Sequence, residues 1–323
     1  MPANLIITVD LGATKILSAL INSRNRIIER VKLPTEAEKG KNYIVKNIVE
    51  SVEQLKIAKG INDKDIKAIC LGVPGIVNPH TGMIDLAPNL KLKNLNIKNE
   101  LKKYFNIPVL VENDVNLAGL GIKKYELKDK VNNMIVIFVG TGIGGALFFE
   151  GKLYRGSTFF AGEIGHIKVT KKGEISSSAA ESTFELIASR TAIVSGIRMD
   201  MKKKKKGVLK GYASNKKIIK SKLLQSALKN GDPVVVKNVK SACVTIGSVL
   251  GSITTLLNID TIVLGGGVIE AMGGFMLPKI KDSFKKAVLK GLDKNVTIFT
   301  TKLGDDAPLY GGIALAEEFL KAK

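Results

Sequence analysis

Residues 6–21 are IITVDLGATKILSALI, in which two apolar runs flank a short turn that contains glycine and threonine. Apolar runs on either side of such a turn predict a β-hairpin, with strands at Ile6–Val9 and Ile16–Ile21. The segment MIVIFVGTGIGGALFF repeats this plan, from a strand at Met134–Val139 to a returning strand at Ala146–Phe149. Two similar hairpins about 130 residues apart predict a duplicated lobe.

The remaining apolar patterns alternate between strand and helix spacing. Strands are predicted at Ile69–Val73, Val109–Val111 and Thr261–Leu264. Helices are predicted at Tyr43–Leu55, from Asn116, at 234–257, through Phe275 to Val288, and at Ile313–Leu320 with Pro308 near the start. Mixed elements in two half-repeats predict an α/β fold with two lobes around a ligand-binding cleft. We expect 1–116 plus 306–323 to form the smaller N-terminal lobe and 117–305 the larger C-terminal lobe.

The composition favours a globular protein of a reducing compartment. Hydrophobic residues make up 45% of the 323 residues, too many for a disordered chain. The two cysteines, Cys70 and Cys243, stand beside apolar neighbours, which indicates packing rather than a disulfide framework. The first apolar run stops at Asp10 and is too short for a secretory signal. We therefore expect a cytoplasmic protein.

The formal charge of +21 raises the question of nucleic acid binding. Only six of the 50 basic residues are arginines, the side chain that nucleic-acid readers use for bidentate base contacts. An excess of lysine is typical of a solvated surface, so no nucleic-acid partner is expected. Five successive lysines, Lys202–Lys206, predict an exposed loop, with a polyanion site as the alternative.

The uncharged segment 241–259 has the length of a membrane span and carries Gly247 and Gly251 at small-xxx-small spacing. Polar side chains interrupt it at Ser241, Thr245, Ser248, Ser252, Thr254, Thr255 and Asn258. A buried helix of a soluble core therefore fits better than a membrane span. The two glycines would let another helix approach closely.

The turn Asp10–Lys15 has the composition of a phosphate-binding turn. Glycine between two strands lets backbone N–H groups approach phosphate oxygens, and Thr14 adds a hydroxyl donor. Asp10 at the strand end would repel phosphate, so its useful role is to hold a hydrated Mg²⁺. An ordinary hairpin turn is the alternative interpretation.

The second turn, Gly140–Gly145, contains four glycines in six positions, more than a turn needs. Close approach of the backbone to a ligand explains the excess. The turn is not a Walker A loop, because no Gly-Lys-Ser/Thr follows. It is not a Rossmann fingerprint either, because a strand follows it rather than a helix.

Two further segments carry polar side chains suited to chemistry. Residues 112–114, Glu-Asn-Asp, follow a predicted strand, where a carboxylate that faces a cleft is a candidate general base. Helix capping by Asn113 or Asp114 is the alternative. Residues 161–166, AGEIGH, place a glutamate three residues before one of only two histidines. That pair suits the hydroxyls of a polyol, and a structural histidine is the alternative.

In order and spacing, these four motifs resemble the ROK family (repressors, open reading frames and sugar kinases) of the hexokinase and actin-like ATPase superfamily. The resemblance runs over nearly the whole chain and includes GVPGIV at 72–77, APNL at 87–90 and the turn Gly265–Gly267. It implies a two-lobed actin-like ATPase (ribonuclease H-like) fold with an interlobe active site. It also implies a sugar kinase that uses ATP and Mg²⁺, and a homodimer.

The resemblance assigns roles to individual residues, with Asp114 at the position of the catalytic base. The residues at sugar-contacting positions are Gly75, Asn89, Asn113, Asp114, Glu163, His166 and Glu185. The residues at ATP-binding positions are Asp10, Gly12, Thr14, Lys15, Gly140, Thr141, Gly142, Gly144, Gly265, Gly266 and Gly267. Asp10 would also reach Mg²⁺ through water.

The chain departs from the family pattern at a zinc site. Family members often carry Cys-x-Cys-x₄-Cys with the motif histidine as fourth ligand, whereas the same register here holds Ser176, Ser178 and Thr183. Hydroxyls do not replace thiolates on zinc, so no structural zinc is predicted. We expect packing through Phe184 and Ile187 to hold this loop instead.

The segments 72–77 and 87–90 resemble the glucokinase branch, so glucose phosphorylated at its 6-hydroxyl is the expected reaction. Fructose, mannose, allose, N-acetylglucosamine and N-acetylmannosamine stay open as acceptors. Polyphosphate, bound through Lys202–Lys206, stays open as the donor. A ROK repressor is the competing class. ROK repressors carry a helix-turn-helix domain ahead of the kinase-like part. Since the first phosphate motif here begins at residue 10, we expect no such domain in front of it.

Overall fold

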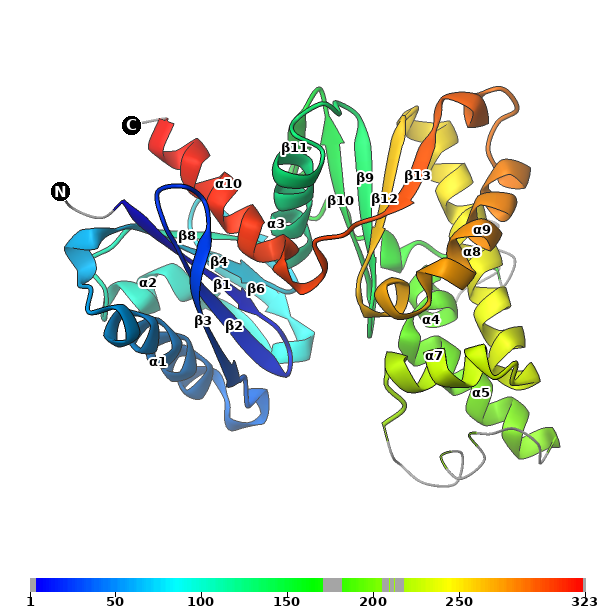
Figure 1. The fold of residues 1–323 in the computed structure, drawn as a ribbon, viewed down its shortest axis with the longest axis horizontal. Helices are drawn as coiled ribbons and strands as arrows, with labels where there is room; N and C mark the ends of the chain where they lie inside the picture. The colour runs from blue at the N-terminus through cyan, green and yellow to red at the C-terminus, as the bar shows by residue number, and fades with distance from the viewer. Residues whose placement is uncertain (1–3, 171–181, 205–208, 210–211, 213–217, 322–323) are drawn as a thin grey trace. The chain divides into compact units, whose positions relative to one another are not determined.

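The structure is a computed structural model that describes residues 4–170, 182–204, 209, 212 and 218–321. The chain forms two compact units (Figure 1). Unit 1 contains Met1–Val131, Leu153–Ala161 and Asp305–Lys323, and unit 2 contains Asn132–Lys152 and Gly162–Gly304. The boundary expected after residue 116 falls inside helix α3 (Asp114–Gly121), and unit 1 continues to Val131.

Unit 1 is built on a five-stranded sheet in the order β3-β2-β1-β4-β8. The strands are β1 (Leu5–Leu11), β2 (Lys15–Ile21), β3 (Ile27–Pro34), β4 (Ile66–Val73) and β8 (Val109–Asn113). β1, β2 and β3 are antiparallel neighbours, which confirms the first predicted hairpin, whereas β4 and β8 run parallel to β1. The three parallel strands end at one edge of the sheet, where ligand sites of such folds are built.

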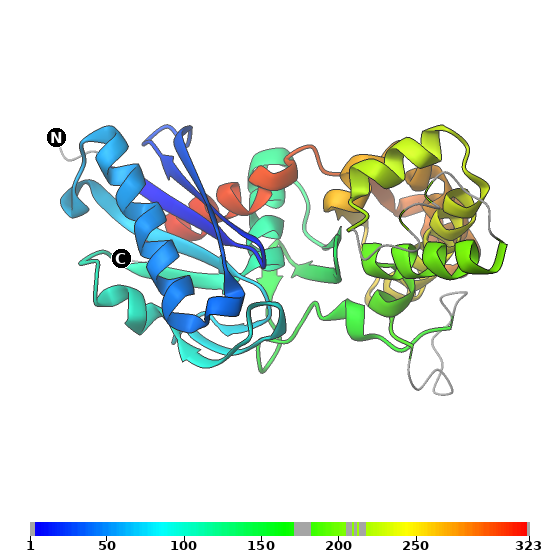
Figure 2. The same ribbon diagram turned by 90° about the horizontal axis from the view of Figure 1, so that it is seen from below.

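Alternate residues of β1 enter two different cores, as the two-residue period of a strand requires. Ile7 packs in the core with α1 (Lys41–Lys59), whereas Ile6 packs in the core with α10 (Ala307–Lys321). Figure 2 shows α1 and α10 on opposite faces of this sheet. The sheet of unit 1 is therefore covered by a helix on each side.

Helices α3 and α10 approach closely because glycines lie at their crossing. A Cβ atom on Gly311 would lie 1.7 Å from the carbonyl oxygen of Leu117, and one on Gly121 would lie 2.2 Å from that of Ala307. Both positions therefore exclude any side chain. This crossing fixes the helix whose first residue is Asp114.

A small antiparallel sheet, β5-β6-β7, completes unit 1 together with a short helix. These elements are β5 (Ile76–Asn78), β6 (Met83–Ala87), β7 (Leu92–Asn96) and α2 (Ile97–Lys102). The sequence patterns did not predict the three strands, because polar residues interrupt each apolar run.

Unit 2 contains a second five-stranded sheet, in the order β11-β10-β9-β12-β13. The strands are β9 (Met134–Val139), β10 (Ile143–Phe149), β11 (Lys152–Tyr154), β12 (Thr261–Gly265) and β13 (Thr297–Thr300). β9 and β10 form the second predicted hairpin, and β12 and β13 run parallel to β9. Both sheets thus share one strand order, which confirms the predicted duplication.

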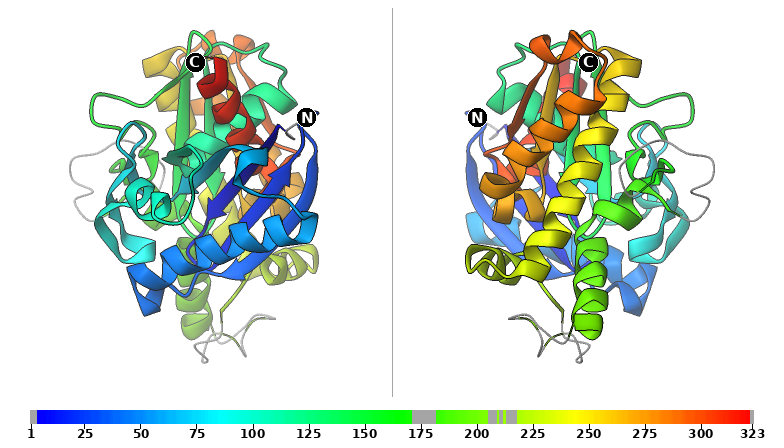
Figure 3. Two further views of the ribbon diagram at one scale, coloured as in Figure 1. Left: turned by 90° about the vertical axis from the view of Figure 1, so that its left-hand side faces the viewer. Right: turned by 90° about the vertical axis from the view of Figure 1, so that its right-hand side faces the viewer.

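The helices of unit 2 include two long ones that pack side by side, α8 (Pro233–Leu257) and α9 (Gly267–Ala287) (Figure 3). The shorter helices are α4 (Phe184–Ala188), α5 (Arg190–Lys204) and α7 (Ser221–Lys229). A Cβ atom on Gly247 would lie 2.4 Å from the Ile280 carbonyl oxygen, and one on Gly251 would lie 2.7 Å from the Val288 nitrogen. The two glycines of α8 therefore admit α9, as predicted.

By length and hydropathy, α8 alone among the described residues could cross a membrane, but 61% of its most apolar window is buried within the structure. That burial matches the core helix expected from its polar residues. The lysine run differs from its expectation, because α5 continues through Lys204 and so includes Lys202–Lys204. Lys205 and Lys206 lie outside the described residues.

Candidate functional site

Asp10 and Asp114 lie near one another at the ends of parallel strands of unit 1. Asp10 pairs with Gly72 of the intervening strand β4, and a Cβ atom on Gly72 would lie 3.5 Å from the Cα atom of Asp114. Burial raises the pKa of Asp10 to about 7, with Asp114 and Asp305 adding to the rise and Lys15 opposing it. The site therefore concentrates negative charge that a cation would relieve.

The first glycine turn is held by Thr35, a residue that sequence reasoning missed. The Thr35 hydroxyl donates to the carbonyl of Gly12 at 2.6 Å, and its N–H donates to the carbonyl of Thr14 at 3.2 Å. Within the turn, the Gly12 N–H donates to the Lys15 carbonyl at 2.9 Å. Thr35 is fully buried and Thr14 is exposed. Nothing in the local sequence marks Thr35 as a clamp on a turn more than 20 residues earlier.

Two aspartates just before α10 were also missed. Lys15 forms an ion pair with Asp305, and Arg30 forms one with Asp306 at 2.8 Å. Both acids belong to the short helix η7 (Gly304–Asp306). The predicted turn lysine is therefore already paired within unit 1, and its pairing brings a third carboxylate towards Asp10.

Asn113 is the N-cap of α3, so the capping role left open between Asn113 and Asp114 belongs to Asn113. Its Oδ1 accepts from the N–H groups of Val115 at 2.9 Å and Asn116 at 3.0 Å. Its Nδ2 donates to the Gly75 carbonyl at 3.0 Å. Asp114 is the first residue of the helix, and its Oδ1 accepts from the Val115 N–H at 2.9 Å. The sugar contact assigned to Asn113 stays a prediction.

Glu112 supports the same turn from inside the protein. Its side chain is buried and accepts from Arg155 Nε at 2.7 Å, from the Asn113 N–H at 3.0 Å and from Asn116 Nδ2 at 3.1 Å. A buried carboxylate needs such partners to stay charged. Glu112 is therefore a structural part of the Glu-Asn-Asp motif.

Gly75 contacts two parts of the predicted sugar site. It accepts from Asn113, and its φ of +97° belongs to the region that glycine favours. A Cβ atom there would lie 2.3 Å from the Leu86 carbonyl oxygen, in the strand that leads to Asn89. Asn89 is exposed in the short helix η3 (Pro88–Leu90). Unit 1 thus brings the segments of Gly75, Asn89 and Asn113 together.

In unit 2, the glycine turn between β9 and β10 lies against Glu185 of α4. The Ile143 N–H donates to Glu185 Oε2 at 2.8 Å, and a Cβ atom on Gly142 would lie 2.3 Å from the same oxygen. Gly140 has open space where its Cβ would be, and Gly144 lies in β10 opposite Phe138. At Gly142, then, the absence of a side chain admits a protein carboxylate.

Glu163, His166 and Glu185 form one group in unit 2. His166 Nε2 lies 3.6 Å from Glu163 Oε2, and His166 is mostly exposed. Burial raises the pKa of Glu163, His166 lowers it, and Glu185 raises it. The predicted polyol residues of this unit are thus neighbours, with acceptor oxygens and an imidazole in reach of one another.

The segment that departs from the zinc pattern is held by backbone pairing and packing. Lys168 and Thr183 form an antiparallel bridge, and the Phe184 N–H donates to the Ile167 carbonyl at 2.8 Å. Phe184 is fully buried and Ile187 packs against the same core, as expected. Thr183 caps α4, whereas Ser176 and Ser178 lie outside the described residues. The absence of zinc stays a prediction, and within the described ranges no cluster of three metal-binding side chains occurs.

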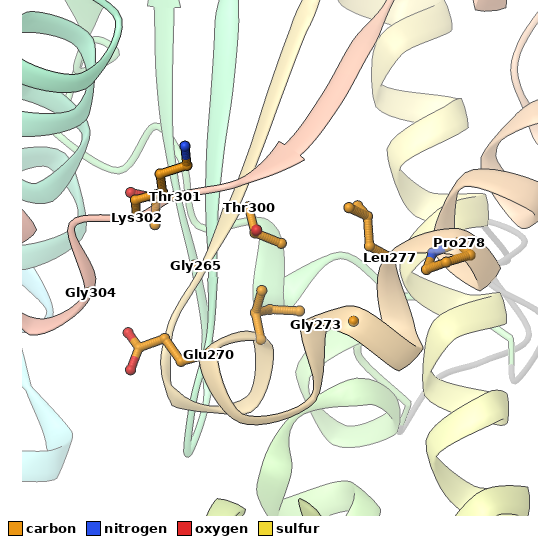
Figure 4. Close-up of a pocket in the computed structure, with 11 residues that line it drawn as sticks. Gly265, Glu270, Gly273, Leu277, Pro278, Thr300, Thr301, Lys302 and Gly304 are labelled. Carbon is orange, nitrogen blue, oxygen red and sulfur yellow. The ribbon is translucent and has the colours of Figure 1, made fainter.

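A pocket of about 500 Å³ lies beside the third predicted glycine turn (Figure 4). Its lining includes Gly265 at the end of β12, Glu270 and Leu277 of α9, and Thr300 and Lys302 of the β13 end. Gly266 caps α9 with a φ of +86°, and Gly267 is the first residue of that helix. The N-terminus of α9 therefore starts next to the pocket, where its dipole favours a negative group.

A duplicated five-stranded sheet, with glycine turns at the hairpins and a carboxylate pair at the strand ends, defines an actin-like ATPase fold. Comparison with known proteins agrees: residues 6–319 match the ROK family. The chain belongs to the ROK family.

Three relatives illustrate the similarity. A glucokinase of Halalkalibacterium halodurans is 29% identical over 305 residues, which cover 94% of this chain and 92% of that protein. A xylose repressor of Caldicellulosiruptor bescii is 28% identical over 313 residues, which cover 96% of this chain and 77% of the repressor. Among solved structures, a ROK family glucokinase from Streptomyces griseus in complex with glucose and AMPPNP has a TM-score of 0.83 at 27% identity, covering 98% of this chain and 100% of that one.

Proposed function

We propose that this protein is a sugar kinase that transfers the γ-phosphoryl group of ATP to a hexose hydroxyl, with glucose as the acceptor and Asp114 as the general base. The observation that carries the proposal is the pair of Asp10 and Asp114 beside a glycine turn. Asn113 is the N-cap of α3, so the capping alternative for this motif is met by Asn113, while Asp114 adds one hydrogen bond from the Val115 N–H. Similarity to glucokinases supports the choice of glucose.

In the proposed reaction, a carboxylate oxygen of Asp114 accepts the proton as the sugar hydroxyl oxygen bonds to the γ-phosphorus. The bond from that phosphorus to the bridging oxygen breaks, and ADP leaves. Phosphoryl transfer needs positioning and charge neutralisation more than covalent chemistry. Backbone N–H groups of the two glycine turns are suited to stabilise the charge on the phosphates.

The donor set of unit 1 fits Mg²⁺. This ion prefers oxygen ligands and is commonly held by one or two carboxylates together with substrate phosphates. Asp10 supplies such a carboxylate at the end of β1, next to the strand β4 that separates it from Asp114. Asp10 would hold the ion through water. When bound, Mg²⁺ neutralises charge on the donor phosphates.

Glu163, His166 and Glu185 of unit 2 and Asn89 of unit 1 are the proposed sugar contacts, with Gly75 and Asn113 supporting them. The donor nucleotide would place its base and ribose near Gly265–Gly267, where the pocket at α9 offers about 500 Å³. That volume lies within the range of small-molecule sites. We also propose that the protein acts in the cytoplasm as a homodimer, which light scattering coupled to size-exclusion chromatography tests.

The test is a coupled ADP-release assay with Mg-ATP over a panel of glucose, fructose, mannose, allose, N-acetylglucosamine and N-acetylmannosamine. We expect sugar-dependent ADP release, fastest with glucose. Another sugar at the top of the panel would reassign the acceptor and keep the kinase. Replacing ATP with polyphosphate tests the donor, with the sugar phosphate as the measured product because this donor leaves as a shorter polyphosphate rather than ADP. Equal rates with the two donors would overturn the choice of ATP.

A sugar-sensing regulator is the second candidate, because one xylose repressor matches 96% of this chain and one glucokinase 94%. A regulator needs the sugar contacts but no general base. A folded protein that binds a hexose and releases no ADP with any sugar would favour this candidate. Measurable binding to DNA with strong salt dependence would support it further.

A further inference from the structure

Glu185 contacts two predicted binding regions of unit 2 at once. Its Oε2 accepts the Ile143 N–H at 2.8 Å at the end of the second glycine turn. Its Cβ atom would lie 3.4 Å from a Cβ atom on Gly165, in the segment that carries Glu163 and His166. One side chain therefore lies between the donor-type turn and the acceptor-type segment.

The shape of the turn depends on this carboxylate. A Cβ atom on Gly142 would lie 2.3 Å from Oε2 and 3.0 Å from the carboxyl carbon of Glu185. On the other side, a Cβ atom on Gly165 would lie 2.3 Å from the Ile143 carbonyl oxygen. Two glycines thus permit the turn, the carboxylate and the acceptor segment to pack without intervening side chains.

The residues after Glu185 hold the rest of the turn. The Arg190 N–H donates to the Gly140 carbonyl at 2.9 Å, and Arg190 Nη2 donates to the Thr141 hydroxyl at 2.5 Å. The Thr191 hydroxyl donates to the Thr141 carbonyl at 2.8 Å. The turn is therefore fixed by the same short stretch, from α4 into α5, that presents Glu185. A shift of Glu185 would be transmitted directly to the turn's backbone amides.

The same carboxylate acts electrostatically on the acceptor group. Glu185 is one of the charges that raise the pKa of Glu163, after burial and the opposing effect of His166. A carboxylate has two acceptor oxygens, so Glu185 can hold the Ile143 amide through Oε2 and accept from a hydroxyl through Oε1. A polyol bound there would restrain the turn as well as the acceptor segment.

We propose that Glu185 is a positioning residue that couples the two substrates: a sugar hydroxyl held by Glu185 fixes the second glycine turn in the geometry that binds the donor phosphates. This inference rests on the proposed kinase function. Its consequence is cooperative binding, in which sugar tightens nucleotide and nucleotide tightens sugar by the same factor. A residue that only contacts sugar would contribute affinity and no coupling.

The experiment measures the Kd of AMPPNP by calorimetry, without sugar and with a saturating concentration of the hexose that gives the fastest ADP release. The ratio of the two Kd values is the coupling factor. For the unmodified protein we expect a factor of about 5–150. In Glu185→Ala we expect it to fall below about 2-fold. Glu185→Gln keeps an amide oxygen that can accept from Ile143, so it should retain most of the coupling.

Glu163→Ala is the matched control, because Glu163 belongs to the acceptor group while the turn is held by Glu185, Arg190 and Thr191. It should weaken the sugar and leave the coupling factor unchanged, with the sugar concentration raised to restore saturation. Unchanged coupling in Glu185→Ala, or equal loss in Glu163→Ala, overturns the proposal. Absence of coupling in an unmodified protein that turns over also overturns it, whereas absence of turnover with every hexose is a failure of the kinase function itself.

Discussion

The two hairpin strands of the duplicated sheets carry different side chains at one equivalent position. In unit 1, Asp10 pairs with Gly72 of the next parallel strand, and in unit 2, Phe138 pairs with Gly265 in the same way. Each lies one residue before the last strand pair ahead of its glycine turn. One copy of the scaffold therefore presents a carboxylate at this position. The other presents a ring, whose Cζ would lie 3.0 Å from a Cβ atom on Gly265.

The side chains that hold the two glycine turns, here called clamps, also differ in charge. A neutral hydroxyl, from Thr35, holds the first turn through a carbonyl, whereas a charged carboxylate, from Glu185, holds the second through an N–H. In unit 1 the charge stands at the strand end and the clamp is neutral. In unit 2 the strand end is apolar and the clamp carries the charge. The two units thus share one backbone arrangement, and they differ in which position carries the carboxylate.

The largest expected effect comes from removing the charge next to the first turn. Asp114→Asn keeps the size of the side chain but loses the proton acceptor, so kcat should fall by about 10²–10⁴-fold. Binding of sugar should persist, as calorimetry can show. The exposed carboxylate of Asp282 in unit 2 provides a control, because Asp282→Asn should leave kcat unchanged. Near-normal turnover in Asp114→Asn would remove Asp114 from the mechanism.

The second effect tests the packing of the segment that carries Glu185. Phe184 is fully buried directly before Glu185, so Phe184→Ala should lower the free energy of unfolding by about 3–5 kcal/mol. Its near neighbour Leu186 is 64% exposed, and Leu186→Ala should change the free energy of unfolding by less than about 0.5 kcal/mol. Urea unfolding measures both. A cost near zero for Phe184→Ala would mean that packing does not hold the segment without zinc cysteines.

The third effect tests the neutral clamp. Thr35→Val removes the buried hydroxyl at nearly constant volume and leaves the Gly12 carbonyl without that donor. We expect a loss of about 1–3 kcal/mol in unfolding free energy and a higher KM for ATP. Thr35→Ser keeps the oxygen and should restore the KM. If Thr35→Ser raises the KM as much as Thr35→Val does, the hydrogen bond to Gly12 is not what supports the turn.

These clamps also show where sequence reasoning reached its limit. The hairpins were predictable because apolar runs and turn residues are local signals, and Asp10 was predictable because it stands at a strand end. Thr35 and Glu185 act on turns 23 and 42 residues away, and no local pattern encodes that contact. The capping role of Asn113 could be narrowed to two residues only, because both neighbours are good caps.

The smallest expected effect concerns the charge of Asp10, the strand position that Phe138 occupies in unit 2. Burial, together with Asp114, raises the pKa of Asp10 from its ordinary 3.8 to about 7 in the folded protein without ligands. The folded protein therefore binds the Asp10 proton more tightly than the unfolded chain does. The free energy of unfolding falls as the pH rises from about 4 to about 7, because Asp10 must then lose that proton in the folded protein. Asp10→Asn removes the titration, so its gain in stability over the unmodified protein should grow between pH 5 and pH 8. One pKa unit corresponds to about 1.4 kcal/mol, so we expect a difference of at least about 1 kcal/mol at pH 8.

Thermal unfolding at several pH values, without nucleotide or metal, measures this difference. Phe138→Leu is the control from the equivalent position, and it should shift the stability equally at every pH because no proton binds there. Added Mg²⁺ should reduce the advantage of Asp10→Asn, because a cation stabilises the ionised carboxylate and lowers its pKa. A pH-independent difference between Asp10→Asn and the unmodified protein would mean that Asp10 is ionised throughout. The contrast between the two strand ends would then be that of a permanent charge at Asp10 and an uncharged ring at Phe138.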